Sequence, residues 1–319
     1  MAVLLVAVLF VGCGTRSAPA PATSEEQVQV TEPVIAAPAP APPYQLFDAS
    51  RSIAYTSRLT DAIGYRPEGS SAEHQAADFV AMSLSEMGYS NVVKQPVPLP
   101  NGATTYDVYT DSPGSNPGEV VVIGAHMDTK GGSGSPGGND DGSGVGAVLE
   151  LARVMRTNPH IPTLRFVAFG AEEVLQGYGS GNHHFGSRYF AANLGLMPGK
   201  VIGMISIDMI GVGTAFYINA TLAAPATFVQ LFEGWTQRMT VPYTFHQDTG
   251  SSDHEAFEAH GIPSFWVEYR DDPYYHSPQD VTANLDPALV KQAGHLVQGF
   301  IENLDPAACA ALDAATIYR

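Results

Sequence analysis

The sequence predicts an α/β domain built on a mostly parallel, mixed central sheet with helices on both faces. Segments with strand character alternate along the chain with segments of helical periodicity, which is typical of such sheets. Residues 118–125 form a nearly continuous apolar run, as in a strand that is buried on both faces. The 319 residues are 45% hydrophobic, which is enough for one large core.

The N-terminal residues 1–13 are predicted to be a signal segment. Residues 2–11 are an unbroken apolar run that is too short to span a bilayer as a helix. The run ends in Gly12-Cys13, which resembles the lipobox of bacterial lipoproteins, where the cysteine becomes lipidated. We expect an exported protein held at the cell envelope through Cys13; secretion with an ordinary signal is the alternative. Residues 14–43 are rich in Pro and Ala and predict an extended linker.

The folded domain is predicted to cover residues 44–305, with residues 306–319 as a C-terminal tail. A first helix is expected over 50–63. After a turn at Arg66-Pro-Glu-Gly-Ser70, a second helix is expected over 72–87, because Ser70 or Ser71 is a suitable N-cap. Its apolar residues lie mostly on one face, and Gly88 ends it.

The remaining elements alternate between strand and helix. Strands are predicted over residues 91–97, 104–110, 118–125, 163–169, 201–208, 214–218 and 262–268. Helices are predicted over residues 143–157, 185–194, 225–238, 253–260 and 286–303. Ligands bind beyond the carboxyl ends of the strands in such sheets. His126, Glu172 with Glu173, and Asp208 all follow predicted strands, so we expect them to meet at one edge.

The composition excludes some classes of partner. Lys and Arg total 15 against 32 Asp and Glu, and the formal charge is −17. We therefore expect no binding to nucleic acid, and an anionic membrane would repel the domain. The two cysteines, Cys13 and Cys309, do not suggest a disulfide framework, and Cys309 is expected to be partly buried near the C-terminus.

The motif His126-Met-Asp128 follows the central strand, and its histidine is a candidate metal ligand. A ligating imidazole uses one nitrogen for the metal and needs an acceptor for its other N–H, which Asp128 would supply. Asp140-Asp141 lies in the Gly-rich loop 131–144. Adjacent carboxylates repel unless a cation intervenes, although a flexible loop with helix-capping aspartates is the alternative.

Three further segments supply donors. In Glu172-Glu173 one glutamate would bind metal and the other would transfer protons, the alternative being a solvated acidic turn. Asp208 lies in an apolar run, where a carboxylate is rarely buried unless it is paired or metal-bound. His276 lies in a polar loop, where solvent exposure is the alternative. Imidazole and carboxylate donors together suit zinc.

Together these motifs resemble the bacterial aminopeptidases with co-catalytic zinc ions, the leucyl-aminopeptidase type with an α/β exopeptidase fold. The resemblance covers about residues 50–303, and it implies two zinc ions per chain. Asp140 would bridge both ions, His126 and Asp208 would complete one site, and Glu173 and His276 the other. In this family the Asp140–Asp141 peptide is usually cis.

The resemblance also implies catalytic roles. Glu172 would be the general base, Asp128 would orient His126, and Tyr275 would polarise the scissile carbonyl. The expected activity is removal of N-terminal, apolar residues from peptides with a free N-terminus, by a monomer. The alternatives are a glutaminyl cyclase with one zinc, a carboxypeptidase or dipeptidase of the same fold, and a non-catalytic surface lipoprotein.

The segment 174–190 is longer than in compact members of the family and is expected to rim the pocket. We interpret His183 and His184 within it as part of a polar loop rather than as ligands. Ser252-Asp253-His254 is interpreted as helix capping at Ser252, because its residues are contiguous rather than separately converging. An apolar pocket wall is expected from five aromatic residues: Phe216, Phe245, Phe257, Trp266 and Tyr274.

Overall fold

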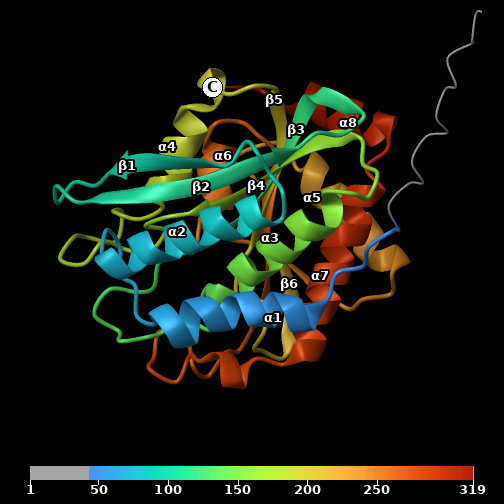
Figure 1. The fold of residues 1–319 in the computed structure, drawn as a ribbon. Coiled ribbons are helices and arrows are strands. Elements are labelled where there is room, and N and C mark those ends of the chain that lie inside the picture. Colours follow the sequence, from blue (N-terminus) through green and yellow to red (C-terminus); the bar gives the residue numbers. More distant parts are fainter. Residues whose placement is uncertain (1–42, 319) are drawn as a thin grey trace, which may run out of the picture. The chain divides into compact units, whose positions relative to one another are not determined.

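The computed structural model describes residues 43–318, and within them an eight-stranded mixed sheet organises the fold (Figure 1). Its strands are β1 (Val93–Pro98), β2 (Thr104–Ser112), β3 (Asn116–His126), β4 (Pro162–Phe169), β5 (Lys200–Ile207), β6 (Ala215–Ala220), β7 (Thr244–Gln247) and β8 (Ser264–Arg270). The helices are α1 (Ala49–Ser57), α2 (Ser71–Glu86), α3 (Gly142–Met155), α4 (Phe185–Ala192), α5 (Thr227–Arg238), α6 (His254–Ala259), α7 (Pro287–Glu302) and α8 (Pro306–Ala315).

The strand order is β1-β2-β4-β3-β5-β8-β6-β7. The central strands β4, β3, β5 and β8 are parallel to one another. Antiparallel pairings occur towards the two edges, where β2 pairs with β4 and with β1, and β6 pairs with β8. The predicted fold class, a mostly parallel mixed sheet, is confirmed.

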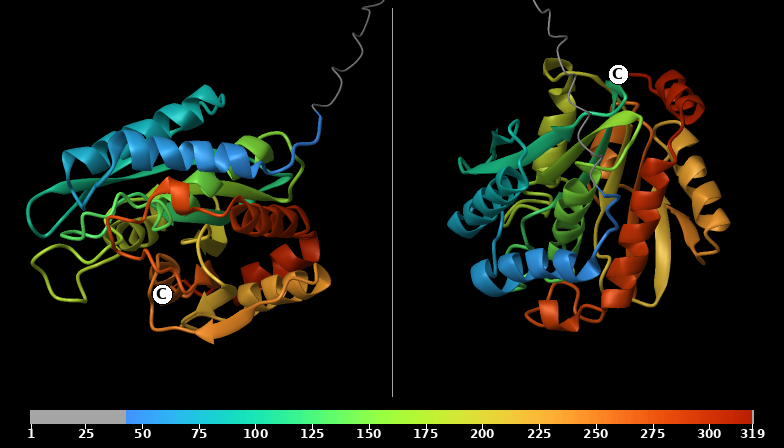
Figure 2. Two further views of the ribbon diagram at one scale, coloured as in Figure 1. Left: turned by 90° about the horizontal axis from the view of Figure 1, so that it is seen from below. Right: turned by 45° about the vertical axis from the view of Figure 1, so that its right-hand side comes forward.

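Alternate residues of β3 enter two different cores, because successive side chains of a strand point to opposite faces. Val121 and Ile123 belong to a large core that also contains residues of α2, α3, α5 and α7. Val120 and Val122 belong to a smaller core with Phe190 of α4 and Phe257 of α6. Helices therefore cover both faces, and Figure 2 shows the same layers from two further sides.

The local signals explain most helix boundaries. The hydroxyl of Ser70 accepts the amide hydrogen of Glu73 at the start of α2, and Gly88 follows the helix with a φ of 92°. The helix predicted over 50–63 is present, but its second half, Arg58–Ile63, is a π-helix.

The sequence patterns missed one strand and one α-helix. Strand β7 is short and mostly exposed at the sheet edge, so it lacks a buried apolar alternation. The expected tail 306–319 contains α8, which Asp305 caps and in which Pro306 occupies the first turn. Cys309 in α8 is fully buried rather than partly buried, because the helix packs on the large core.

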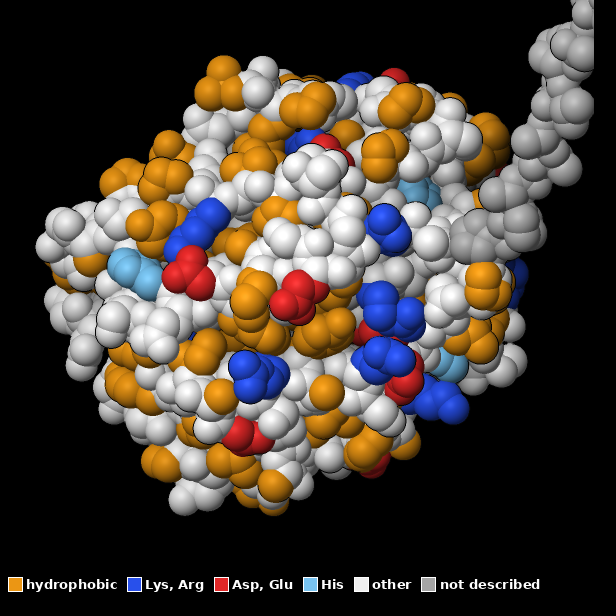
Figure 3. All heavy atoms as spheres, viewed as in Figure 1, with side chains coloured by type: hydrophobic (Ala, Val, Ile, Leu, Met, Phe, Trp, Pro, Cys, Tyr) orange, Lys and Arg blue, Asp and Glu red, His pale blue; other side chains and the backbone are white. Residues whose placement is uncertain are grey.

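The predicted signal segment 1–13 and all but the last residue of the linker 14–43 lie outside the described residues. Within residues 43–318, none of the helices combines the length and the apolar character needed to cross a bilayer. On the face drawn in Figure 3, basic and acidic side chains are interspersed, so the negative charge does not form a patch on that face.

Candidate metal centre

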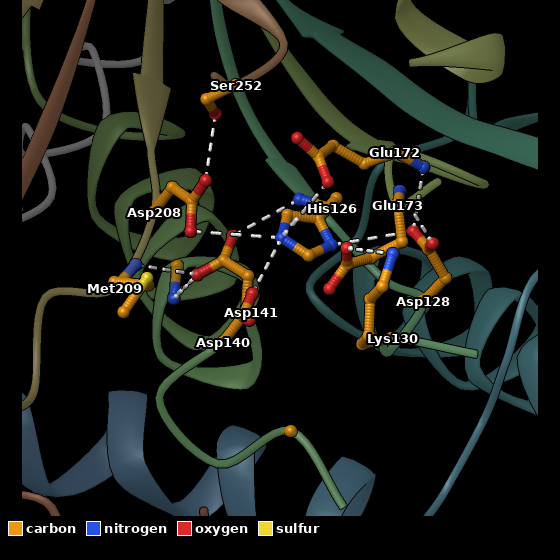
Figure 4. Close-up of polar contacts among 12 residues, drawn as sticks. His126, Asp128, Lys130, Asp140, Asp141, Glu172, Glu173, Asp208, Met209 and Ser252 are labelled. Carbon is orange, nitrogen blue, oxygen red and sulfur yellow. Dashed lines mark hydrogen bonds and ion pairs between the residues drawn. The ribbon is translucent and has the colours of Figure 1, made fainter. Parts of the chain in front are cut away.

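The predicted ligands converge in two groups that share Asp140. Ligand atoms of His126, Asp140 and Asp208, all labelled in Figure 4, lie within 4.8 Å of one another. Those of Asp140, Glu173 and His276 do so as well. Oδ1 of Asp140 is 3.1 Å from Nε2 of His126, while its Oδ2 is 3.0 Å from Nε2 of His276. The two oxygens of one carboxylate thus serve two separate groups.

The sheet brings these residues together. His126 is the last residue of β3, Glu172 and Glu173 follow β4, and Asp208 follows β5. Since these strands are adjacent and parallel, their carboxyl ends lie at the same edge. Asp140 arrives from the loop before α3, and His276 from the loop after β8.

Asp128 makes more contacts than the sequence predicts. Its Oδ1 lies 3.4 Å from Nδ1 of His126, the expected orienting contact. Its two oxygens also accept the amide hydrogens of Glu172 and Glu173, at 2.9 and 3.0 Å. Backbone donors leave no mark in a sequence pattern, so this second role was missed.

Asp141 fixes the backbone around the site. Its Oδ1 accepts the amide hydrogens of Gly144 and Met209, and its Oδ2 accepts that of His126. The peptide between Asp140 and Asp141 is cis. Asp141 therefore caps α3 and joins the ends of β3 and β5, while Asp140 faces both ligand groups.

Two buried residues hold the glycine-rich loop that carries Asp140. Asp280 accepts the amide hydrogens of Asn139 at 2.6 Å and of Asp140 at 3.2 Å. The guanidinium of Arg66 donates to the carbonyls of Met127 and Gly137. Arg66, from the turn noted in the sequence, and Asp280 thus support the loop.

The hydroxyl of Ser252 donates to Oδ2 of Asp208 at 2.8 Å, and the indole N–H of Trp266 donates to the Asp208 carbonyl. The interpretation of Ser252 as a helix cap is wrong. Asp253 occupies the N-cap position of α6, with no side-chain cap bond. The Ser252 hydroxyl instead donates to the carboxylate of Asp208, which follows β5.

The crowded, buried carboxylates of this site favour binding of a cation. Burial and then the Asp140 carboxylate raise the pKa of Glu173 to about 7, and burial and then Asp141 raise the pKa of Asp208 well above its usual range. Burial would also raise the pKa of Asp140, but hydrogen bonds from His126 and His276 hold it below its usual value. Oδ1 of Asp208 is buried and has no hydrogen-bond partner among the described residues. These donors fit zinc, which takes imidazole and carboxylate ligands and would stabilise the ionised carboxylates.

Glu172 lies beside the two groups without belonging to either. Its Oε2 is 4.0 Å from Nε2 of His126, and its Oε1 is 2.8 Å from Nε2 of His184. His184 lies in the loop before α4 and in neither ligand group, as predicted, but it is buried, with only 2% exposed, rather than solvated. His183 is half-buried, with its ring packed edge-on against that of His184.

Tyr275 lies at the mouth of the site and is 52% exposed. Its ring stacks on that of His276, with 3.7 Å between ring centroids. Partial burial of the phenol and then the Asp140 carboxylate raise the pKa of Tyr275 above its usual range. The phenol therefore keeps its proton and can donate a hydrogen bond to a bound molecule.

Two cavities adjoin the centre. One, of about 210 Å³, is lined in part by Lys130, Glu172 and Glu173. The other, of about 320 Å³, is lined by Met209, Ser251, Trp266, Glu268, Arg270, Asp271, Asp272 and Tyr275. Ser251 and Tyr275 line both, so the cavities meet there.

The predicted aromatic wall is largely absent from the second cavity. Of the five expected residues, only Trp266 lines it. Phe216 and Phe257 are buried in the two cores, and Phe245 lies on the edge strand β7. The prediction failed because the periodicity of apolar residues in a sequence does not distinguish residues that face a core from residues that face a pocket.

The chain is similar in sequence to known peptidases. Residues 107–301 match the model of peptidase family M28. Aminopeptidase YwaD of Bacillus subtilis (strain 168) is 31% identical over 196 residues, which cover 56% of this chain and 40% of that protein. The chain spans less than half the length of the first curated relatives it matches.

Solved structures share the fold. A zinc aminopeptidase from Bacillus subtilis, BSAP, superposes with a TM-score of 0.68 at 17% identity, covering 86% of this chain and 98% of that one. Glutaminyl cyclase from Tannerella forsythia superposes with a TM-score of 0.69 at 23% identity, covering 81% of this chain and 99% of that one.

Proposed function

The chain belongs to peptidase family M28, as its motifs indicated, and from that premise we propose that it is a zinc-dependent aminopeptidase. It would remove single residues from peptides with a free N-terminus and would use two zinc ions. The observation that carries this proposal is Asp140, whose two oxygens lie about equally far from a histidine of each ligand group. A carboxylate in that position suits a pair of ions better than a single one.

The proposed ligand set is His126, Asp140 and Asp208 for one ion and Asp140, Glu173 and His276 for the other. Bound zinc would lower the pKa of a water molecule and polarise a carbonyl. Asp128 would keep the His126 ring in place, since it lies 3.4 Å from the ring nitrogen that faces away from Asp140.

Glu172 is the proposed general base. Its Oε2 faces the ligand groups, so it can accept a proton from attacking water there and return it to the leaving amine. The Tyr275 phenol keeps its proton and is proposed to donate a hydrogen bond to the carbonyl oxygen as negative charge develops on it.

The position of Glu172 also supports a proposal for which part of the substrate each cavity binds. A base that protonates the leaving amine must lie on the leaving-peptide side, and Glu172 lines the cavity of about 210 Å³. The N-terminal residue would then occupy the cavity of about 320 Å³ beyond Tyr275. We propose an apolar N-terminal side chain that packs on Met209 and Trp266, with the free α-amine held at the metal centre or by a nearby carboxylate.

A carboxypeptidase or dipeptidase is the second candidate. Nζ of Lys130 lies 3.6 Å from Oε2 of Glu173, so a cation stands where a short peptide could present its own carboxylate. A glutaminyl cyclase is the third, because a protein of that name shares the fold. It would work with one zinc and perform an intramolecular transfer.

One experiment separates these functions. Metal content is measured by mass spectrometry, and hydrolysis is followed on leucyl, lysyl and glutamyl anilides, on N-acetyl-leucyl anilide, on an N-blocked peptide with a free carboxylate, and on a glutaminyl peptide. We expect two zinc ions, chelator-sensitive release from leucyl anilide and none from the acetylated form. Cleavage of the N-blocked peptide, or cyclisation with one zinc, would overturn the proposal.

Location and assembly are further proposals. We propose that the protein is exported and anchored through a lipidated Cys13, on the apolar run and Gly12-Cys13 of the sequence, and that it acts as a monomer. Incorporation of labelled fatty acid into the wild type, and its loss in Cys13→Ala, would test the anchor. Analytical ultracentrifugation of the folded domain in buffer without detergent would test whether it is a monomer.

A further inference from the structure

His184 is the buried end of an otherwise exposed segment. Residues 176–181 are exposed to solvent, whereas His184 is 2% exposed. A histidine at the end of a polar loop has no need to be buried, because its ring nitrogens can bond to water. Its burial therefore requires partners inside the protein.

Backbone hydrogen bonds join His184 and the two residues after it to residues 170–172, which follow β4. The amides of His184, Phe185 and Gly186 donate to the carbonyls of Glu172, Ala171 and Gly170, at 2.7, 2.8 and 3.0 Å. These three bonds fix the Cα of His184 relative to that of Glu172. The backbone consequently keeps the two side chains within reach of each other.

The backbone conformation of His184 would favour a smaller residue. Its φ of 55° and ψ of 35° are left-handed, and it precedes α4 without a side-chain cap bond. Glycine adopts this conformation without steric cost, and among the other residues asparagine, aspartate and histidine are enriched in it. The backbone therefore tolerates a histidine here but does not require one, so the reason for it lies in its side-chain contacts.

Both ring nitrogens of His184 contact carboxylates. Nε2 lies 2.8 Å from Oε1 of Glu172, and Nδ1 lies 3.2 Å from Oε2 of Glu255. That same Glu255 oxygen accepts Nη2 and Nε of Arg188, at 3.1 and 3.3 Å. The result is a chain Glu172–His184–Glu255–Arg188 that connects the base to a surface ion pair.

We propose that His184 is a positioning residue, which holds Oε1 of Glu172 so that Oε2 faces the metal centre. Oε2 is the oxygen 4.0 Å from Nε2 of His126. Without His184, the carboxylate is free to rotate about its terminal torsion, which is broad and roughly two-fold. This inference rests on the proposed peptidase function of Glu172, but it adds a residue to which no part of that function assigns a role.

The consequence is specific to one step. His184 belongs to neither ligand group and lines only the cavity of about 210 Å³. Its loss therefore leaves the five ligand residues in place, so metal content should persist and substrate binding should change little. Proton transfer by Glu172 should become slower, because fewer of its orientations are productive. A purely structural role would instead lower stability or metal content together with activity.

Four variants test this. His184→Gly suits the left-handed backbone and removes the ring. His184→Gln restores an N–H donor towards Glu172. Glu255→Gln disturbs the second link. His260→Gln is the matched control, since it makes the same replacement at a histidine that lines neither cavity and whose Nδ1 lies 2.8 Å from the Ala256 carbonyl oxygen. Zinc content, thermal unfolding, kcat and KM on leucyl anilide are measured for each.

For His184→Gly we expect kcat to fall about 10- to 100-fold, the range for residues that orient active groups, with KM within about two-fold and zinc unchanged. His184→Gln should recover most of kcat, and Glu255→Gln should show a smaller loss. His260→Gln should keep kcat within about two-fold of wild type. Wild-type kcat in His184→Gly, or a parallel loss of zinc, would overturn the proposal.

Crystal structures of the wild type and His184→Gly provide a readout that does not depend on activity. We expect the Glu172 carboxylate to rotate away from its wild-type orientation in the variant. An unchanged carboxylate would overturn the positioning role. If the wild-type protein hydrolyses no substrate, the proposed function fails, while this structural comparison still decides the role of His184.

Discussion

Ser252 donates its hydroxyl hydrogen to one oxygen of Asp208 and leaves the other oxygen without a partner. The bond to Oδ2 is 2.8 Å long, and Oδ1 is buried with no hydrogen-bond partner among the described residues. Oδ1 is also the oxygen that lies 3.8 Å from Nε2 of His126. Ser252 therefore orients Asp208, with its unpartnered oxygen towards the first ligand group.

Ser252→Ala should weaken zinc binding at that group. The alanine leaves Asp208 free to turn, and loss of a partner that orients a ligand typically costs about 10- to 100-fold in metal affinity. Competition with a chromophoric chelator measures it. Ser264→Ala is a suitable control, because within residues 43–318 the buried Ser264 hydroxyl bonds only the carbonyl of Ile262. Equal affinities for Ser252→Ala and the wild type would contradict the orienting role.

Glu172→Gln should keep both metal ions and lose turnover. Glutamine has nearly the same shape but cannot take up the proton from water, and general acid–base catalysis contributes about 10²- to 10⁴-fold. Kcat and zinc content are measured on the same preparation. Glu258→Gln serves as the control, since Glu258 is a buried glutamate that accepts the amides of Thr221 and Leu222. Near-normal turnover would remove Glu172 from this role.

Asp140→Asn and His276→Gln should differ in how many ions they lose. Asp140 belongs to both ligand groups, whereas His276 belongs to one. We expect His276→Gln to retain one zinc per chain and Asp140→Asn to bind both ions weakly. Native mass spectrometry at increasing zinc concentration counts the ions in each case. Two tightly bound ions in Asp140→Asn would show that Asp140 does not bridge, and a single ion in the wild type would favour a one-zinc centre.

The ligand positions could be predicted from sequence because strand ends are visible there. His126, Glu172 and Asp208 each follow an apolar run, and parallel strands bring such ends together without any knowledge of the loops. The fold class followed from the same alternation. Pairing and order of the edge strands did not, since β7 is short and exposed and has no pattern of its own.

The supporting contacts could not be predicted because they depend on geometry between distant segments. Ser252 looked like a helix cap, yet its hydroxyl lies against a carboxylate 44 positions away in the chain. His184 looked like a loop residue, and its burial depends on backbone pairing with residues 170–172. Composition and spacing describe a segment's own preferences, not the partner that the fold brings to it.

Leu312→Ala should destabilise the domain although it lies in the segment expected to be a tail. Leu312 is fully buried in the large core, and α8 packs against β5 and α5. Truncation of a buried leucine leaves a cavity and typically costs about 2–5 kcal/mol. Urea unfolding with chelator present measures this without a contribution from metal binding. Leu196→Ala is the matched control, because Leu196 is 85% exposed and its truncation should change stability by less than about 0.5 kcal/mol. If the two variants unfold at the same urea concentration, α8 does not contribute to the core, and the domain would end before it.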